Sequence, residues 1–150
     1  MPITQSDAFT FFGATGDLAY KKIFPALYAM VRRGSFQIPI IGVSRSGLTL
    51  DKLKDRAHDS IKHGVSDFDE STFAKLASLL RVCNGDYGDE KTFKQLREVI
   101  GLAKNPIHYL AIPPSMFASV VSGLKKSGCA DNARVIVEKP FGREIGRAHV

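Results

Sequence analysis

The sequence predicts a doubly wound α/β domain, in which helices cover both faces of a parallel sheet. Short apolar segments alternate with longer helical patterns along the chain, and this order implies right-handed crossovers between parallel strands. The short segments are apolar throughout rather than at every second residue, as expected for strands that are buried on both faces. With 150 residues and 44% hydrophobic content, the chain is long enough for one core.

The N-terminal part is expected to form a strand, a helix and a second strand. The first strand is Ala8–Gly13, where apolar residues run into a glycine. The helix is Asp17–Arg33, with apolar residues at helical spacing and a basic last turn before a glycine. Pro25 lies inside this helix and is expected to kink or restart it. Gln37–Val43 is apolar and predicts the second strand.

The central part is expected to form two helices and a third strand. Leu50–His63 has a helical pattern that Asp51 helps to start. Ser71–Leu80 is a shorter amphipathic helix, and Arg81–Asn84 follows it as a short strand.

The C-terminal part adds two helices and two strands. Asp89–Ala103 and Ser115–Ser127 carry apolar residues at helical spacing. Ile107–Ile112 is a continuous apolar strand that two prolines stop, and Arg134–Val137 is the fifth strand. Ligands of such a sheet bind outside the carboxyl ends of its strands.

The turn between the first strand and the first helix predicts a Rossmann-like dinucleotide site. A strand that turns at once into a helix brings backbone N–H groups and a helix N-terminus together, where a pyrophosphate binds. Gly13 permits the tight turn, Gly16 allows close approach of the phosphate, and Ala19 is the third small residue, where helix packs on strand. A glycine-rich turn without a ligand is the alternative.

Two further strand ends carry candidate ligand-binding residues. Domains that bind NAD place a carboxylate after the second strand, whereas this chain has Arg45, which suits a 2′-phosphate and favours NADP. Lys139 follows the fifth strand, where it can donate to a substrate oxygen and to the nicotinamide side. The alternatives are a surface arginine and a solvated lysine.

Composition limits the other classes of partner. The net charge is +6, but the basic residues are dispersed and do not indicate a nucleic-acid surface. No segment has the roughly 18 apolar residues of a membrane helix. Residues 1–7 lack a basic segment followed by an apolar one, so no secretory signal is expected. The two cysteines lack metal-ligand spacing and are expected to be buried thiols, so no metal is expected and a cytoplasmic location is favoured.

The histidines are expected to have no catalytic role. His58 and His63 fall on a helix that is expected to be exposed, without a nearby carboxylate, and His108 falls in an apolar strand, as a core histidine would.

The chain resembles the glucose-6-phosphate dehydrogenase family over nearly its whole length. Five segments carry the resemblance: residues 13–19, 21–28, 45–46, 109–114 and 138–142. It implies NADP-dependent oxidation of the C1 hydroxyl of glucose 6-phosphate to 6-phosphogluconolactone. Sugar oxidoreductases of the Gfo/Idh/MocA type share the Glu-Lys-Pro segment and are an alternative, but they are not expected to share the residues that follow Gly16.

The resemblance also implies a role for each site residue. The cofactor phosphates would lie on Gly13, Ala14, Thr15, Gly16, Asp17, Leu18, Ala19 and Lys21. The end of the fourth strand would lie along the cofactor through Tyr109, Ala111 and Pro113. Arg45 would bind the 2′-phosphate, and Lys139 would contact both sugar and cofactor. Gly47 stands where some relatives have a second cation, so Arg45 has less support here.

The resemblance also implies a second α+β domain, which is expected to lie outside these 150 residues. That domain carries the catalytic histidine in an R-I-D-H-Y-L-G-K-E type segment, which is absent from these 150 residues. No catalytic residue is therefore assigned, and the chain alone is expected to bind NADP without turnover. Homo-oligomers are expected only of the full-length parent. A free-standing NADP-binding or sensing domain is the alternative.

The last residues depart from the family pattern. Ile145–Val150 matches the translation of a common sequencing adapter. We therefore expect residues 1–143 to be the dinucleotide-binding domain and residues 144–150 to be a foreign tail from read-through.

Overall fold

A computed structural model describes residues 7–34, 36–45, 47–101, 103–129 and 133–137. Its five strands form one parallel sheet in the order β3-β2-β1-β4-β5. The strands are β1 Ala8–Phe12, β2 Ile40–Ser44, β3 Leu80–Asn84, β4 Pro106–Leu110 and β5 Arg134–Val137. The predicted doubly wound α/β class is confirmed. Lys139 and the predicted tail, residues 144–150, lie outside the described residues, so the predicted boundary at residue 143 stays a prediction.

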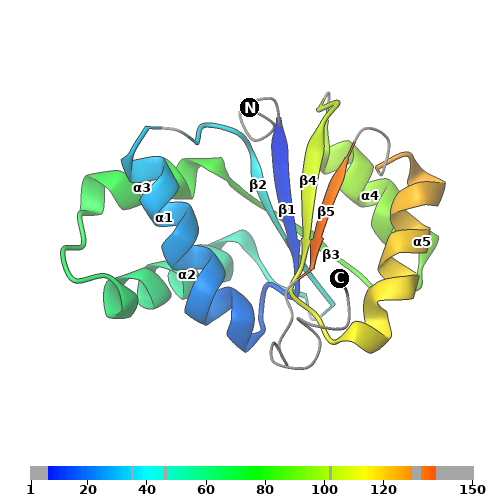
Figure 1. Cartoon of the computed structure of the whole chain (residues 1–150), viewed down its shortest axis with the longest axis horizontal. Helices are drawn as coiled ribbons and strands as arrows, with labels where there is room; N and C mark the ends of the chain where they lie inside the picture. The colour runs from blue at the N-terminus through cyan, green and yellow to red at the C-terminus, as the bar shows by residue number, and fades with distance from the viewer. Residues whose placement is uncertain (1–6, 35, 46, 102, 130–132, 138–150) are drawn as a thin grey trace, which may run out of the picture.

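The helices form a layer on each face of the sheet (Figure 1). One layer holds α1 Phe24–Arg32, α2 Leu50–Gly64 and α3 Glu70–Leu79, and the other holds α4 Glu90–Ile100 and α5 Phe117–Ser127. The chain proceeds from β1 to β3 in one direction across the sheet and from β4 to β5 in the other. Right-handed crossovers therefore place the two sets of helices on opposite faces. The reversal falls beside β1, where such sheets bind ligands.

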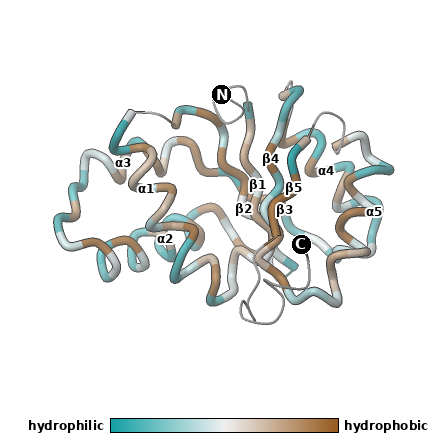
Figure 2. Tube along the Cα trace, viewed as in Figure 1, coloured by the Kyte–Doolittle hydropathy of each residue, from teal (hydrophilic) through white to brown (hydrophobic). Residues whose placement is uncertain are grey.

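Each helical layer closes a hydrophobic core on its own side of the sheet. Phe9 and Phe11 of β1 point into the core under α1 to α3, whereas Ala8 and Phe12 point into the core under α4 and α5. This alternation follows from the pleat of the strand. Figure 2 shows hydrophobic residues along the central strands and a mixture of hydrophobic and hydrophilic residues along the helices.

The first helix is not the single α-helix that the sequence predicts. A π-helical turn, η2 Ala19–Ile23, precedes α1, and Pro25 lies in the first turn of α1. Proline has no N–H to donate to the carbonyl four residues back, and a wider turn accommodates that lost bond. The expected restart at Pro25 is confirmed. The Ser60 hydroxyl of α2 donates to the Tyr20 carbonyl in this turn.

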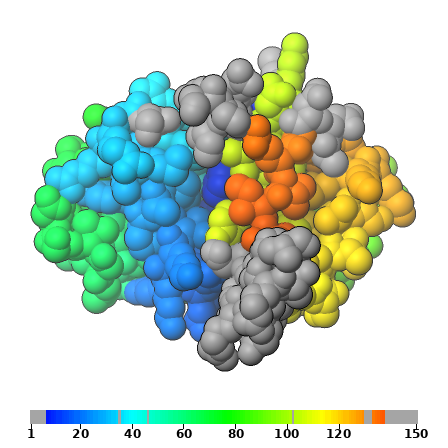
Figure 3. All heavy atoms as spheres, viewed as in Figure 1, coloured from blue at the N-terminus to red at the C-terminus, as the bar shows by residue number. Residues whose placement is uncertain are grey.

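Strand β5 is more exposed than the sequence predicts for a strand covered on both faces. All four of its residues are exposed, and Val135, Ile136 and Val137 each retain about two-fifths of their surface at 42%, 39% and 41%. Figure 3 shows β5 open to this side of the molecule between α1 and α5. An apolar groove of about 350 Å³ runs beside it, between α1 and the strands β1, β4 and β5. The expectation of coverage on both faces holds for β1 and β2, which are buried throughout.

None of the helices within the described ranges is both long and apolar enough to cross a membrane.

Candidate functional site

The predicted glycine turn stands at the carboxyl end of β1, at the centre of the sheet. The N–H of Gly13 lies 3.0 Å from the Val43 carbonyl of β2 and 3.0 Å from the Tyr87 hydroxyl. The Tyr87 hydroxyl lies 3.3 Å from the same carbonyl, to which it donates. Burial raises the pKa of the Tyr87 phenol, so the hydroxyl keeps the proton that it donates. These bonds fix the start of the turn against the neighbouring strand.

Gly13 has a backbone conformation that only glycine adopts here without cost. Its φ is +87°, and a Cβ at this position would stand 2.2 Å from the Ala111 carbonyl oxygen. The N–H of Gly16 donates to the Gly13 carbonyl at 2.9 Å and closes a tight turn. The predicted role of Gly13 in the tight turn is confirmed.

The remaining residues of the turn divide into buried and exposed sets. Ala14 and Ala19 are buried at 0% exposure, which is compatible with the predicted packing of Ala19 between helix and strand, and that packing stays a prediction. Thr15, Asp17 and Lys21 are exposed, and Gly16 and Leu18 are half-buried. The outer surface of the turn is therefore available to a ligand.

Arg45 lies on the same edge of the sheet, directly after β2. Its side chain is exposed, and its guanidinium lies 5.8 Å from the centre of the Tyr87 ring. Tyr87 thus contacts both the glycine turn, through its hydroxyl, and Arg45, through its ring. The two sequence-predicted parts of the site are joined by one residue.

Asn84 holds the loop that follows Arg45. Its side-chain carbonyl accepts from the Leu48 N–H at 2.8 Å, and its amide donates to the Leu48 carbonyl at 2.6 Å. This pair of bonds ties the loop after β2 to the end of β3, and so limits how far Arg45 moves from the sheet edge.

The predicted residues of the fourth strand lie in three different environments. Ala111 is buried against the glycine turn, and its N–H donates to the Phe12 carbonyl at 3.0 Å. Tyr109 is half-buried in the α1 layer, 6.3 Å from Phe9 between ring centres. Pro113 is exposed after the strand. Ala111 thus supports the turn directly, whereas Tyr109 lines the apolar groove beside β5.

Three residues of this site were missed by sequence reasoning: Arg56, Asn84 and Tyr87. Arg56 of α2 donates to the carbonyls of the turn. All three lie far along the chain from the groups that they hold, and a local pattern does not predict such contacts. Tyr87 had one weak signal, because it follows a strand at the edge where ligands bind.

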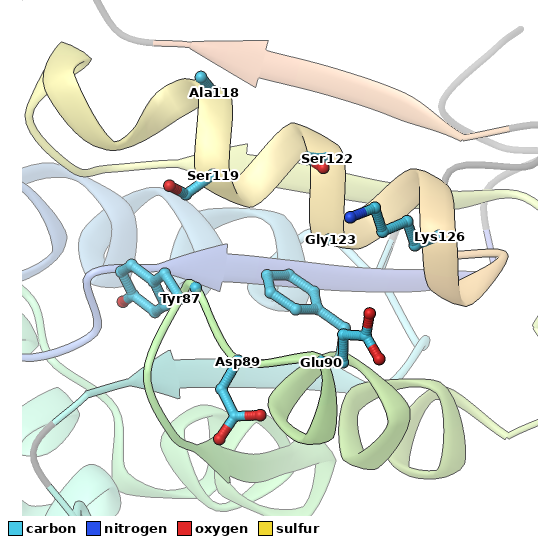
Figure 4. Close-up of a pocket in the computed structure, with 10 residues that line it drawn as sticks. Tyr87, Asp89, Glu90, Ala118, Ser119, Ser122, Gly123 and Lys126 are labelled. Carbon is cyan, nitrogen blue, oxygen red and sulfur yellow. The ribbon is translucent and has the colours of Figure 1, made fainter.

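A second cavity lies between α4 and α5 (Figure 4). It is connected with the glycine turn through Tyr87, which lines the cavity and also contacts Gly13. Ser119, Ser122 and Lys126 of α5 line one side, and Asp89 and Glu90 line the other. The Asp89 carboxylate accepts from the Lys91 N–H at 2.9 Å as the cap of α4. Asp89 and Glu90 bring two negative charges to the lining and Lys126 one positive charge, so this cavity is a poor place for the phosphates of a dinucleotide.

The described residues contain no cluster of three or more histidine, cysteine or acidic side chains that would hold a metal. Both cysteines are buried and free, as predicted. Burial raises the pKa of the Cys83 thiol to about 12, so it stays protonated near neutral pH and is not a nucleophile.

His108 is a core histidine, as predicted. It is fully buried, with Nδ1 2.6 Å from the Thr10 hydroxyl and Nε2 2.7 Å from the Cys129 carbonyl. Because Nε2 faces an acceptor, it carries the proton, and the Thr10 hydroxyl donates to Nδ1. Burial lowers the pKa of His108.

The expectation that His58 and His63 lack carboxylate partners is wrong. Nε2 of His58 lies 3.1 Å from the Glu70 carboxylate, because α3 begins beside α2. Nδ1 of His63 lies 3.5 Å from Asp59, one helical turn earlier. Both contacts stand apart from the glycine turn.

Comparison with known proteins identifies the family of this chain. A family model described as "Glucose-6-phosphate dehydrogenase, NAD binding domain" matches residues 10–149. The chain belongs to the glucose-6-phosphate dehydrogenase family. The match spans the glycine turn and Arg45, so the family's dinucleotide-binding domain and the geometric site are the same part of the chain.

Individual relatives support the same family. Glucose-6-phosphate 1-dehydrogenase 1 of Mycobacterium tuberculosis is 38% identical over 143 residues, which cover 95% of this chain and 30% of the relative. The crystal structure of the Mycobacterium avium glucose-6-phosphate 1-dehydrogenase is 44% identical, with a TM-score of 0.86 over 96% of this chain and 32% of that one. A glucose-6-phosphate dehydrogenase solved in complex with glucose 6-phosphate is 32% identical, with a TM-score of 0.79 over 97% of this chain and 33% of that one. The chain thus spans about a third of the length of these relatives.

Proposed function

We propose that this chain is the NADP-binding part of a glucose-6-phosphate dehydrogenase. The observation that carries the proposal is Arg45, an exposed cation beside the Tyr87 ring at the carboxyl end of β2. A carboxylate at this point would repel a 2′-phosphate, whereas a guanidinium pairs with it. Arg45 therefore recognises the 2′-phosphate, and the adenine lies against the same planar groups.

The pyrophosphate of the cofactor binds at the turn between β1 and the first helix. Ala14, Thr15 and Gly16 supply a backbone without a bulky buried side chain between the ligand and the sheet, and the N-terminus of the helix favours negative charge. Asp17 is exposed at this helix start, and it acts there as a helix-starting acid. Lys21 is an exposed cation one turn further along.

The whole protein would oxidise glucose 6-phosphate at C1 and pass a hydride to NADP. One solved relative is a complex with this substrate. Lys139 would contact sugar and cofactor from the end of the fifth strand, by the family pattern. The reaction needs a base that accepts the C1 hydroxyl proton, and the histidine segment that supplies it in the family is absent from these 150 residues. The 150-residue chain alone would then bind the cofactor and not reduce it.

Titration of the 150-residue chain with NADP and with NAD tests this function. We expect NADP to bind more tightly than NAD, and Arg45→Ala to weaken NADP binding by about tenfold or more, as for the loss of a charged hydrogen bond. Arg32→Ala is the matched control, because Arg32 pairs with Asp67 on the exposed surface of α1. Equal affinity for the two cofactors, or no binding of either, would refute the proposal.

Two further properties are proposed for the whole protein. The buried free thiols are in keeping with a reducing compartment such as the cytoplasm. Homo-oligomers of defined size are proposed for the full-length parent, whereas any association of the 150-residue chain through its exposed strand β5 is a separate property of this part. Gel filtration of the full-length parent and of the 150-residue chain tests the oligomeric state. Cell fractionation, followed by detection of the parent, tests the location.

A further inference from the structure

One arginine, Arg56, lies against the glycine turn on the side that the carbonyls of the turn face. Arg56 is half-buried in the second turn of α2. The helix starts at Thr49, whose side chain caps it by accepting from the Lys52 N–H at 3.1 Å. Leu53 and Ala57 of α2, three residues before and one residue after Arg56, are buried in the core. Helix packing thus fixes where the guanidinium lies.

The Arg56 guanidinium donates hydrogen bonds to the backbone carbonyls of three successive residues. Nε donates to the Ala14 carbonyl at 3.1 Å. One terminal nitrogen, Nη2, donates to the carbonyls of Thr15 at 2.8 Å and Gly16 at 2.9 Å. The same guanidinium lies 5.2 Å from the centre of the Tyr20 ring. Contacts on several sides leave it little freedom to turn.

Because peptide bonds are planar, these contacts also determine the direction in which the N–H groups of the turn point. In a planar trans peptide the N–H points opposite to the carbonyl of the preceding residue. With the carbonyls of residues 14–16 facing Arg56, the N–H groups of Thr15, Gly16 and Asp17 face away from it. Gly16 uses its N–H to close the turn onto Gly13. The Thr15 and Asp17 N–H groups have no backbone acceptor among the turn and loop bonds of the described residues, and they are the donors presented outward.

The charge of Arg56 acts in the same direction. An arginine is protonated at every physiological pH. Within the described residues, the ion pairs are Arg32–Asp67, His58–Glu70 and His63–Asp59, so Arg56 takes part in none of them. Asp59 of the same helix accepts instead from the Tyr20 hydroxyl. The three partners of Arg56 on the turn are neutral carbonyls. A positive charge behind outward-facing N–H groups strengthens the attraction for an anion on their other side.

We propose that Arg56 is the positioning residue of the phosphate-binding turn. It holds the turn's carbonyls on the inner side so that the alternating N–H groups face the cofactor pyrophosphate, which Arg56 itself does not touch. The proposal rests on the proposed function, because it takes a dinucleotide as the ligand. Arg56 and Arg45 then act on different halves of the cofactor: Arg56 on the pyrophosphate and Arg45 on the 2′-phosphate.

The test compares two ligands on the 150-residue chain. NADP carries both phosphate groups, whereas adenosine 2′-monophosphate carries only the one assigned to Arg45. Arg56→Gln should weaken NADP binding by about tenfold or more and leave binding of adenosine 2′-monophosphate, followed by NMR titration, as in the wild type. Arg45→Ala should weaken both ligands. Arg32→Gln, which removes an arginine from a surface ion pair, should change neither.

Arg56→Lys is the second variant. It keeps the charge but loses the planar fork that reaches three carbonyls, so its NADP affinity should lie between those of the wild type and Arg56→Gln. It decides the question if Arg56→Gln does not fold, since wild-type affinity in the lysine variant would overturn the proposal.

The outcomes separate the two proposals. A wild-type chain that binds no NADP refutes the proposed function, whatever Arg56 does. A wild-type chain that binds NADP, together with an Arg56→Gln variant that binds it equally well, overturns the positioning role alone. Equal weakening of NADP and adenosine 2′-monophosphate in Arg56→Gln also overturns it, because a general loss of structure would affect both ligands.

Discussion

Gly13 shows how much one residue decides at this site. Its positive φ and the close approach of Ala111 are separate constraints: the first penalises any side chain through the backbone, and the second through direct contact. Both constraints arise because the chain must turn sharply after β1 within the space left by the neighbouring strand β4.

Gly13→Ala should therefore destabilise the chain and abolish NADP binding. We expect a loss of about 2 to 4 kcal/mol in the free energy of unfolding, as the sum of a strained φ and a backbone collision. Gly34→Ala is the matched control, because Gly34 has a similar φ of +77° and nothing within 4 Å of a Cβ. Urea unfolding of both variants measures the difference. Equal losses would mean that Ala111 does not constrain the turn.

His108 should make stability depend on pH. Its pKa is lowered in the folded state. As the pH falls, the unfolded state, with a pKa near 6.5, therefore binds a proton at a higher pH than the folded state does. The stabilisation is fully present above about pH 6.5 and is lost as the pH falls from there toward the folded pKa, by about 1.4 kcal/mol for each tenfold difference in proton affinity between the two states. Unfolding free energies measured between about pH 5 and 8 test this. His108→Gln should flatten the profile, whereas His63→Gln, at an exposed histidine, should not.

At this scale the sequence indicates some site residues and not others. Gly13 and Arg45 are predictable because a motif fixes each at the end of a strand. Arg56 lies 42 residues from the carbonyl of Ala14, and Tyr87 lies 74 residues from Gly13. Such contacts exist only after the sheet has formed, so no local spacing indicates them.

The elements were predictable to within a few residues where their patterns are local. Leu50–Gly64 and Arg134–Val137 lie at or within one residue of the predicted bounds, since a capping threonine and a short apolar run define them. The second strand begins at Ile40 rather than Gln37, because pairing with β1 starts only there. The π-helical turn before α1 was not predictable, since it depends on how α2 packs beside Tyr20 as well as on Pro25.

The end of β3 should control the loop that carries Arg45. Asn84→Ala removes both bonds to Leu48, so the loop gains freedom that cofactor binding must then remove. We expect NADP affinity to fall by about three- to tenfold, with Arg45 itself unchanged. Calorimetric titration measures this. Asn105→Ala, at an exposed residue before β4, is the control, and the same loss in both variants would contradict a specific role for Asn84.

At the scale of the whole molecule, the order of elements predicted the doubly wound fold class, whereas the order of the strands in the sheet came only from the structure. Alternating strands and helices, right-handed crossovers and a glycine turn after the first strand imply a site at the central strand, and the structure has Gly13 there. The exposure of β5 was not implied by its apolar sequence, because coverage depends on which helices reach the edge of the sheet. Residues 134–137 pair with β4 alone in the described part of the chain.

That edge should make the 150-residue chain self-associate. An exposed apolar edge strand offers unpaired backbone groups and hydrophobic side chains to another molecule, and Ile136 also lines the groove beside α1. Burial of one such side chain contributes roughly 1.5 to 3 kcal/mol. Ile136→Lys should therefore raise the concentration at which the chain associates by about tenfold or more, as followed by sedimentation velocity. Ala74→Lys adds the same charge at an exposed position of α3 and should leave association unchanged. A wild-type chain that stays monomeric at high concentration would show that this edge is inert.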